Sequence, residues 1–462
     1  MKKRLHFIAI GGAAMHNLAL ALSQNGYLIS GSDDEIMEPS RTRLADAGLL
    51  PESEGWDPQK ITVQLDGVVL GMHARKDNPE LLKALDLGIP VFSFPEFLYE
   101  HAKNKQRVVI GGSHGKTTIT AMILHVLKKL NYNFDYMVGA KIDGFDTMVR
   151  LSDAPLIILE GDEYLSSPID LRPKFHLYKA DIGLISGIAW DHINVFPTVE
   201  NYLDQFRIFA NNIPDKGKLV YCSVDIELKK MVSASVTQAE KIAYSIPKSK
   251  IINGETTLLT EYGEFPIAVF GEHNLMNMEG ARLVCKSLGV KGKPFYNAIA
   301  DFRGASRRLE LLAKNDQVAF YRDFAHSPSK LHATVHAVRQ QYPERKLIAC
   351  MELHTFSSLN ENFLNQYAGT MDEADIPVVF FNPHTIEHKK LKPLSMESVK
   401  SAFKNSGIQV FTNSILFQKY LKSLKRENTV FLLMSSGNFN DMNLVNFAKE
   451  VTGEKSLVQP IG

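Results

Sequence analysis

The chain reads Arg107-Val108-Val109-Ile110-Gly111-Gly112-Ser113-His114-Gly115-Lys116-Thr117-Thr118 where an apolar strand, a glycine-rich turn and a helix are expected to follow one another. Residues 108–110 are apolar like a buried strand, and residues 119–130 have the composition of a helix. This order is typical of a phosphate-binding loop, because backbone N–H groups of the turn and the positive end of the helix surround phosphate oxygens. The stretch therefore predicts a nucleoside triphosphate site, in which Lys116 neutralises the outer phosphates and Thr117 offers its hydroxyl to magnesium.

This loop is tighter than the common pattern. Ile110 stands where that pattern has its first glycine, so the working motif is Gly112-Ser113-His114-Gly115-Lys116-Thr117-Thr118. A glycine turn beside a surface lysine is the alternative interpretation. The agreement between the strand, turn and helix signals favours the phosphate loop.

Composition and charge limit the possible functions. The 462 residues suggest about three domains. The 52 basic and 51 acidic residues leave a net charge of +1, so no overall field favours nucleic acid or an anionic membrane, and small-molecule partners are expected.

Cys222, Cys285 and Cys350 are few and widely spaced, which favours reduced thiols in a cytoplasmic enzyme. The sequence contains no uninterrupted apolar run of about 18 residues, so no transmembrane helix is expected. The apolar N-terminal stretch is interpreted as a buried strand rather than a secretion signal.

The N-terminal segment predicts a Rossmann-like nucleotide fold. Residues 5–10 indicate a buried parallel strand, residues 13–24 a helix and residues 27–30 the next strand. Asp33 resembles the ribose-binding acid of a dinucleotide fold. However, the turn reads Gly11-Gly12-Ala13-Ala14-Met15 rather than Gly-x-Gly-x-x-Gly, which disfavours a nicotinamide cofactor.

Two later strands are followed by acids and a histidine. Residues 156–159 precede Glu160-Gly161-Asp162-Glu163, and residues 182–186 precede Trp190-Asp191-His192. Side chains at the carboxyl ends of parallel strands lie at the ligand-binding edge of a sheet. Because magnesium usually takes only one or two oxygen ligands from a protein, Thr117 and one of these acids suffice to hold it. Glu163 is either a solvated loop acid or a member of the site.

Taken together, these motifs resemble the Mur ligases, the ATP-dependent amide-forming enzymes of peptidoglycan synthesis. The resemblance covers nearly the whole chain, in order, and implies an α/β fold of three domains. These are a UDP-muramate-binding Rossmann-like domain (1–104), a P-loop ATPase-like central domain (105–310) and a Rossmann-like domain for the amine or peptide substrate (311–462). In the last, strands near 318–323, 346–351, 377–381 and 429–434 alternate with helices near 328–341, 396–405, 413–424 and 440–449.

The same resemblance implies the site residues. Lys116, Glu160 and His192 are expected to be catalytic, and magnesium is expected on Thr117, Glu160 and His192. The motifs Gly271–Asn277, Phe302–Glu310 and Asp323–Pro328 complete an ATP site of Gly112, Ser113, His114, Gly115, Lys116, Thr117, Thr118, His273, Asn274, Asn277, Arg308 and Asp323. The UDP-sugar is expected on Gly11, Gly12, Ala13, Ala14, Met15, Ser32, Asp33 and His73. The amine substrate is expected on His326, His354, Thr355 and Asn438.

The reaction that the resemblance implies is the ligation of UDP-N-acetylmuramate to an amine, with ATP and magnesium, through an acyl phosphate. Two amines compete: the murein tripeptide L-Ala-γ-D-Glu-meso-diaminopimelate of peptidoglycan recycling, and L-alanine of de novo synthesis. The passages 164–175, 70–79 and 434–439 favour the tripeptide, whereas Glu352-Leu353-His354 departs from the Glu-Pro-Arg of that type. A nucleotide-binding regulator without turnover is disfavoured by the retained catalytic residues. A monomer or homodimer in the cytoplasm, without nucleic-acid partners, is expected.

Overall fold

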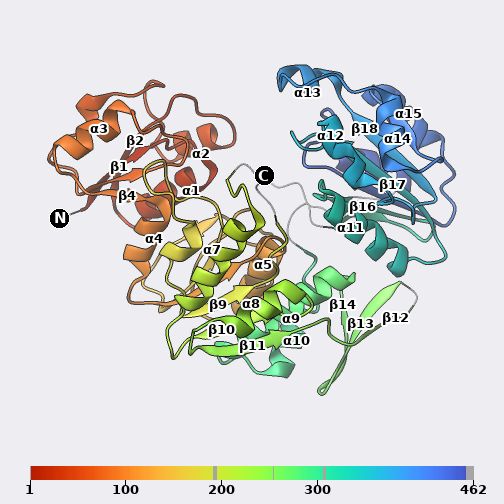
Figure 1. Ribbon diagram of the computed structural model, residues 1–462, viewed down its shortest axis with the longest axis horizontal. Coiled ribbons are helices and arrows are strands. Elements are labelled where there is room, and N and C mark those ends of the chain that lie inside the picture. Colours follow the sequence, from red (N-terminus) through yellow and green to blue (C-terminus); the bar gives the residue numbers. More distant parts are fainter. Residues whose placement is uncertain (1, 191–194, 253, 305–308, 454–462) are drawn as a thin grey trace. The chain divides into compact units, whose positions relative to one another are not determined.

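The computed structural model describes residues 2–190, 195–252, 254–304 and 309–453 (Figure 1). The chain divides into two compact units. The first comprises residues 1–247 and 276–300, and the second comprises residues 248–275 and 301–462.

The first unit begins with a small parallel sheet. Its strands β1 (Arg4–Ile8), β2 (Leu28–Ser32), β3 (Gly67–Leu70) and β4 (Val91–Ser93) have the order β2-β1-β3-β4. The helical elements here are α1 (Ala13–Gln24), α2 (Ser40–Asp46), η1 (Pro58–Lys60), α3 (Pro79–Asp86) and α4 (Phe94–Ala102). Leu18 and Leu22 of α1 are fully buried. Helix α1 therefore packs into the core with its first turn directly after the Gly11-Gly12 turn.

A second sheet of the first unit carries the phosphate-loop motif. It has the order β11-β10-β9-β5-β8-β6-β7, and only β7 is antiparallel to its neighbour. The strands are β5 (Gln106–Gly111), β6 (Asp135–Met137), β7 (Val149–Arg150), β8 (Leu156–Glu160), β9 (Ile182–Ile185), β10 (Lys218–Cys222) and β11 (Glu240–Tyr244). Ile110 of β5 pairs with Glu160 on one side and Leu184 on the other. The carboxyl ends of these three strands are therefore adjacent.

Helices accompany this second sheet. They are α5 (Lys116–Lys129), α6 (Lys174–Leu177), α7 (Val199–Asn211), α8 (Ile226–Ala234), α10 (Gly292–Ile299) and the part of α9 (Glu272–Ser287) that begins at Met276. Helix α5 has nine buried residues, and its Ile119, Ile123 and Leu127 are fully buried. The spacing of four residues places these three side chains on one face of α5, which fixes the phosphate loop to the core.

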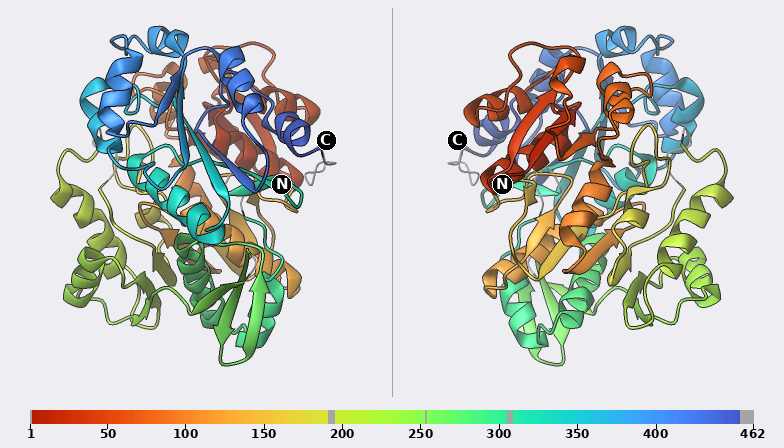
Figure 2. Two further views of the ribbon diagram at one scale, coloured as in Figure 1. Left: turned by 90° about the vertical axis from the view of Figure 1, so that its right-hand side faces the viewer. Right: turned by 90° about the vertical axis from the view of Figure 1, so that its left-hand side faces the viewer.

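The second unit is built on a six-stranded sheet with the order β15-β16-β20-β17-β18-β19. Its strands are β15 (Glu310–Lys314), β16 (Val318–Asp323), β17 (Lys346–Leu353), β18 (Ile376–Phe381), β19 (Gln409–Phe411) and β20 (Thr429–Met434), all parallel except β15. Ala349 and Met351 of β17 belong to one apolar cluster, whereas Ile348 and Cys350 belong to another. The strand is thus buried on both faces, as expected for a parallel sheet with helices on each side (Figure 2).

The helical elements of the second unit follow the strands in turn. They are α11 (Pro328–Gln341), α12 (Glu361–Leu364), η2 (Asn365–Tyr367), α13 (Pro383–His388), α14 (Met396–Phe403), α15 (Ser414–Ser423) and α16 (Leu444–Thr452). A small antiparallel sheet of β12 (Ser249–Ile252), β13 (Glu255–Thr260) and β14 (Gly263–Ile267) also belongs to this unit. It is anchored on α11, because the Thr256 hydroxyl donates to Gln341 Oε1 at 2.9 Å and the Gln341 amide donates to Gly254 O.

The predicted fold class, α/β with parallel sheets in three parts of the chain, is confirmed. The four strands predicted between residues 318 and 434 are β16, β17, β18 and β20. The last predicted helix, near 440–449, was placed too early, since α16 begins at Leu444. Phe439, Asn440 and Asp441 all have positive φ angles, which are incompatible with a right-handed helix. The domain ranges 1–104, 105–310 and 311–462 remain a proposal.

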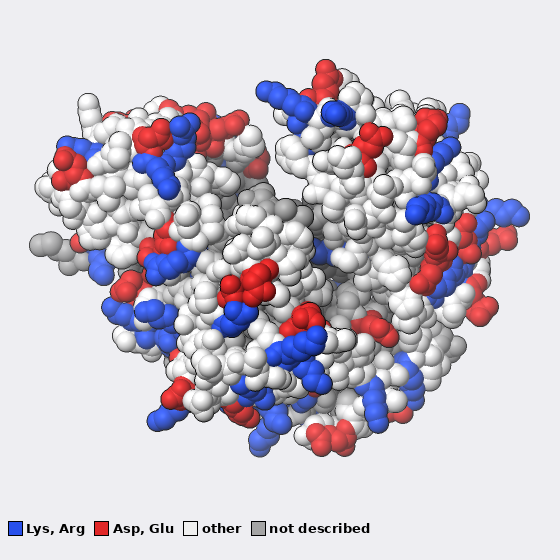
Figure 3. Space-filling model, in the orientation of Figure 1, with Lys and Arg blue, Asp and Glu red and all other residues white. Residues whose placement is uncertain are grey.

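Charges of both signs are interspersed over the face seen in Figure 3, in keeping with the net charge of +1. In the part of the chain that the structure describes, no helix is long and apolar enough to cross a membrane. The three cysteines are buried free thiols.

Candidate active site

The turn between β5 and α5 requires glycine at two positions. Gly112 and Gly115 have φ angles of 132° and 79°, which residues with a side chain rarely adopt. A Cβ at Gly112 would lie 2.1 Å from Ser186 Oγ, and one at Gly115 would lie 2.4 Å from Asn277 Oδ1. The turn is thus fitted between the end of β9 and helix α9, and Asn277, a predicted ATP contact, lies beside the phosphate loop.

Lys116 is held over this turn by two acceptors. Its Nζ donates to Gly112 O at 2.6 Å and to Glu163 Oε2 at 2.8 Å. Burial by itself disfavours the ammonium form, but nearby carboxylates, chiefly Glu163, outweigh burial and raise the pKa of Lys116 above its ordinary value. The lysine therefore carries its charge where an outer phosphate is expected.

Glu163 is a buried partner of Lys116 rather than a solvated loop acid. Its side chain is completely buried, and Glu163 Oε1 also accepts from the Tyr202 hydroxyl at 3.4 Å. The sequence left both interpretations open because an acid in a Glu-x-Asp-Glu run has no local signal for burial. Only the packing of α7, which supplies Tyr202, decides between them.

Thr117 and Glu160 provide two adjacent oxygen atoms. The Thr117 hydroxyl donates to Glu160 Oε1 at 2.7 Å, and the Gly139 N–H donates to Glu160 Oε2 at 2.8 Å. Burial, followed by the charge of Asp162, raises the pKa of Glu160, so a cation nearby would favour its ionised form. Neighbouring ligands of octahedral magnesium lie about 2.9 Å apart. The two oxygens therefore fit a magnesium ion.

The remaining predicted metal ligand, His192, lies outside the described residues. Among the residues that the structure does describe, no group of three or more His, Cys, Asp and Glu side chains is arranged to hold a metal ion. The other loop residues are packed closely: Ser113 Oγ lies 3.2 Å from His114 Nδ1, the His114 ring contacts Gly187, and Thr118 is buried.

The predicted UDP-sugar residues, apart from His73, lie at the carboxyl ends of β1 and β2. The Gly11 N–H donates to Asp33 Oδ2 at 2.6 Å, and the Ser32 carbonyl accepts from the Ala9 and Ile10 N–H groups. Burial raises the pKa of Asp33 to about 6, although the Gly11 N–H opposes this shift. Asp33 thus ties β2 to the glycine turn. Ala13, Ala14 and Met15 form the first turn of α1, which has no side-chain cap, and His73 is exposed beyond β3.

In the second unit, Asp323 ends β16 and anchors the segments around it. It accepts hydrogen bonds from Leu309 N at 2.5 Å and Ala325 N at 2.7 Å. Burial lowers the pKa of His273, while the charge of Asp323 opposes that shift, so these two predicted ATP residues are neighbours. Asn274 uses its amide to donate to Phe270 O at 3.0 Å. Arg308 lies outside the described residues.

The four predicted amine-site residues follow the carboxyl ends of β16, β17 and β20. Their side chains contact nearby residues, His326 Nδ1 with Phe324 O, the Thr355 hydroxyl with Ser358 Oγ, and the Asn438 amide with Asp441 Oδ1, while the His326 carbonyl accepts from the Tyr367 hydroxyl at 2.6 Å. His354 lies 3.9 Å from the Glu352 carboxylate.

Glu352 anchors the loop after β20, a role that was not predicted from the sequence. It is buried and accepts from the Phe439 N–H at 2.8 Å and from the Ser435 hydroxyl, which joins the end of β17 to the loop after β20. An acid inside an otherwise apolar strand is the signal that could have revealed it.

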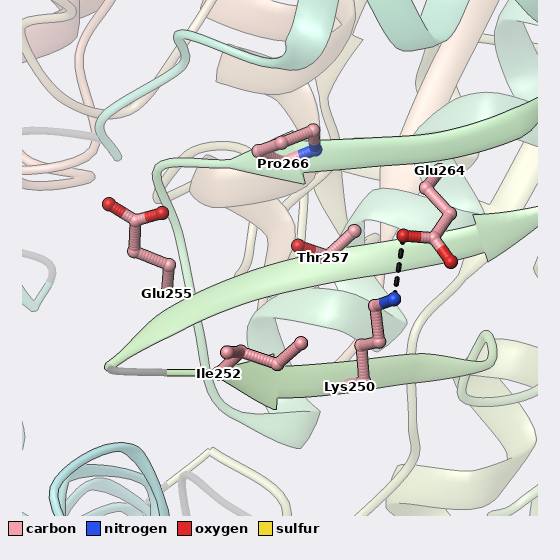
Figure 4. Close-up of a pocket in the computed structure, with 6 residues that line it drawn as sticks. All are labelled: Lys250, Ile252, Glu255, Thr257, Glu264 and Pro266. Atoms are coloured by element: carbon pink, nitrogen blue, oxygen red, sulfur yellow. Dashed lines mark ion pairs between the residues drawn. The ribbon is translucent and has the colours of Figure 1, made fainter.

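A separate hollow lies on the face of the small antiparallel sheet (Figure 4). It is lined by Lys250, Ile252, Glu255, Thr257, Glu264 and Pro266, and an ion pair of 2.6 Å joins Lys250 to Glu264. None of these residues belongs to the predicted sites, and we assign the hollow no role.

A parallel sheet that ends in a phosphate loop, with a buried carboxylate beside the loop threonine, defines an α/β nucleotide-binding protein of the P-loop kind. Comparison with known families identifies it further. Residues 4–106 match the Mur ligase family catalytic domain, residues 110–285 the Mur ligase middle domain, and residues 307–437 the Mur ligase glutamate ligase domain. The chain belongs to the Mur ligase family, and it is therefore an ATP-dependent amide-bond ligase.

Relatives and solved structures cover nearly the whole chain. It is 30% identical over 416 residues to the UDP-N-acetylmuramate--L-alanine ligase of Caldicellulosiruptor bescii, covering 87% of this chain and 88% of the relative. It is 28% identical to the enzyme of the same name from Sulfurihydrogenibium sp., covering 96% of each. The fold is similar to MurC of Thermotoga maritima (TM-score 0.69, 20% identity, covering 97% and 98%) and to a murein peptide ligase of Psychrobacter arcticus (TM-score 0.62, 21% identity, covering 99% and 100%).

Proposed function

We propose that this ligase joins the carboxylate of UDP-N-acetylmuramate to the α-amine of L-alanine. The observation that carries the proposal is the cluster of Lys116, Thr117 and Glu160 at one sheet edge, which is suited to phosphoryl transfer from ATP. The full-length relatives at 28–30% identity, which are named UDP-N-acetylmuramate--L-alanine ligases, support the two substrates. They favour L-alanine over the tripeptide that the sequence passages favour.

The chemistry proceeds in two steps. A carboxylate oxygen of the muramate attacks the γ-phosphorus of ATP, the bond to ADP breaks, and an acyl phosphate forms. The deprotonated amine then adds to the acyl carbon, and the tetrahedral intermediate expels inorganic phosphate. Lys116 neutralises the transferring phosphoryl group, and the N–H groups of the 112–117 turn bind its oxygens.

Thr117 and Glu160 would hold a first magnesium ion, and His192 is proposed to hold a second one near the substrate carboxylate. The first ion would supply positive charge to the phosphates of ATP when bound. Glu163 keeps Lys116 directed at the turn before ATP arrives. For the other residues predicted to contact ATP, the UDP-sugar or the amine, we propose the roles given above. A cytoplasmic monomer or homodimer remains a prediction.

The murein tripeptide is the second candidate amine. Its first residue is L-alanine, so the bond formed is the same. The passage at residues 164–175 favours it, and in the structure this segment is an ordered loop, closed by a bridge between Leu165 and Pro173 and by the Arg172–Asp170 ion pair. His354 disfavours the tripeptide, because it stands where the tripeptide type has an arginine.

A phosphate-release assay with UDP-N-acetylmuramate, ATP and magnesium tests the proposal when only the amine is changed. We expect kcat/KM for L-alanine to exceed that for the tripeptide by at least about tenfold, or roughly 1.4 kcal/mol. A tenfold preference for the tripeptide would replace L-alanine by the second candidate. UDP-N-acetylglucosamine, which lacks the carboxylate, is the control and should release no phosphate. Absence of release with both amines would contradict the ligase proposal.

A further inference from the structure

The loop between β6 and β7, residues 138–148, is hydrogen-bonded to elements of both predicted nucleotide sites. Its two ends are closed by the Val138 N–H, which donates to Met148 O at 3.0 Å. On one side, the Met148 N–H donates to Asn17 Oδ1 of α1 at 3.2 Å. On the other side, the Gly139 N–H donates to Glu160 Oε2 at 2.8 Å. The loop therefore connects the helix after the Gly11-Gly12 turn with the carboxylate beside the phosphate loop.

Asn17 is fixed in a single orientation. It is completely buried, and its Nδ2 donates to Ala13 O at 2.8 Å and lies 3.0 Å from His16 Nε2. Because the amide donates toward the start of α1 and its oxygen accepts from Met148, a flipped side chain would lose both contacts. Asn17 thus links the first turn of α1, where the UDP-sugar is proposed to bind, to the loop.

The loop is braced from a third side by α5, the helix that begins at the phosphate loop. Lys128 donates to Gly144 O, and its Nζ lies 4.9 Å from the centre of the Phe145 ring. Tyr136 packs edge-on against Phe145, with ring centres 5.2 Å apart. These contacts tie residues 138–148 to α5 and β6 as well as to α1 and β8.

We propose that Asn17 is a positioning residue that couples UDP-sugar binding to Glu160 through residues 138–148. The inference rests on the proposed function, because it places the UDP-sugar on the turn before α1. A ligand that fixes the start of α1 favours the observed orientation of Asn17, which in turn holds the loop with its Gly139 N–H aimed at Glu160. The connection is a continuous set of hydrogen bonds with named atoms, so single substitutions test it.

The hydrogen bond from the Gly139 N–H fixes the orientation of the Glu160 carboxylate, whose other oxygen accepts from the Thr117 hydroxyl. A carboxylate held in this orientation presents its oxygen beside that of Thr117, where magnesium is proposed to bind. Weakening the connection should therefore raise the magnesium requirement. It should lower kcat more than it raises KM for UDP-N-acetylmuramate, because Asn17 is not proposed to touch the sugar nucleotide.

Asn25→Ala serves as the control for Asn17→Ala. Asn25 donates to Leu151 O at 2.8 Å and to Ala21 O at 2.7 Å, so it also links α1 to the segment after β7, but from the far end of the helix. Asn25 is exposed, whereas Asn17 is completely buried, so Asn17→Ala should lose more stability, and urea denaturation measures that loss separately from the magnesium dependence. We expect Asn17→Ala to raise the half-saturating magnesium concentration about fivefold, as expected for one lost hydrogen bond, and Asn25→Ala to change it less than about twofold.

Calorimetry provides a readout that is independent of turnover. In the parent, UDP-N-acetylmuramate should bind more tightly in the presence of magnesium and a non-hydrolysable ATP analogue, and Asn17→Ala should reduce this enhancement while Asn25→Ala retains it. Equal magnesium curves and equal enhancement in the two variants would overturn the coupling role and leave the proposed function intact. A parent that binds no UDP-N-acetylmuramate would instead refute the proposed function.

Discussion

The ion pair between Lys116 and Glu163 allows a quantitative test of how the phosphate loop is held before ATP binds. At an effective dielectric constant of about 20, opposite unit charges 2.8 Å apart attract by roughly 6 kcal/mol, but desolvation of both groups offsets much of this. Lys116 keeps 13% of its side chain exposed, whereas Glu163 is completely buried. A double-mutant cycle of Lys116→Met and Glu163→Gln should therefore return a coupling of about 1 to 3 kcal/mol in the free energy of unfolding.

Urea denaturation of the parent, both single variants and the double variant measures this coupling. Lys174 and Asp162 form a matched control, because their ion pair is 3.2 Å long in the same segment but both side chains are partly exposed. Their cycle should return less than about 1 kcal/mol. Since the pKa of Lys116 is raised, its ammonium contributes fully below the ordinary lysine pKa, and the coupling should stay constant from about pH 6 to 9. A Lys116–Glu163 coupling no larger than that of the control pair would show that the buried ion pair does not stabilise the fold more than an exposed one.

Three further predictions concern activity, metal and pH. Lys116→Ala should lower the rate of phosphate release about 100- to 1,000-fold while UDP-N-acetylmuramate still binds in calorimetry, because its proposed site lies on the first sheet; near-normal turnover would speak against the phosphate-loop assignment. Glu160→Gln should shift the magnesium dependence of activity to higher concentrations with little change in folding, and an unshifted curve would place the metal elsewhere. Asp33 has a folded pKa of about 6, above its unfolded value near 3.8, so ionisation of Asp33 destabilises the fold as pH rises through this window. Asp33→Asn should therefore flatten the fall in unfolding free energy between pH 4 and 7, which urea denaturation at several pH values would detect; an unchanged slope would show that Asp33 does not titrate in this range.

The phosphate loop and its strand could be predicted because their signals are local. Gly112, Gly115, Lys116 and Thr117 stand at fixed spacing after an apolar strand, and the structure gives both glycines the left-handed conformation that such a turn needs. That Glu160 lies at the same sheet edge as the loop follows from the alternation of strands and helices, whereas its pairing with Ile110 depends on a strand order that the sequence does not give.

Other features could not be predicted, because they depend on contacts between distant segments. Glu163 is buried and hydrogen-bonded to Lys116 and Tyr202, which come from elsewhere in the chain. Asn17 gains its role from Met148, more than a hundred residues away. The sheet β12–β14 has exposed side chains such as Ile251, Ile252 and Leu259, so its hydrophobic pattern does not alternate as a half-buried strand should.

In the proposed reaction, ATP activates the carboxylate of UDP-N-acetylmuramate as an acyl phosphate. UDP-N-acetylmuramate labelled with oxygen-18 in that carboxylate tests this step directly when the label is followed by mass spectrometry of the released phosphate. We expect one labelled oxygen in each inorganic phosphate, because the attacking carboxylate oxygen leaves with the phosphoryl group. Phosphate without label, formed together with the amide, would contradict it.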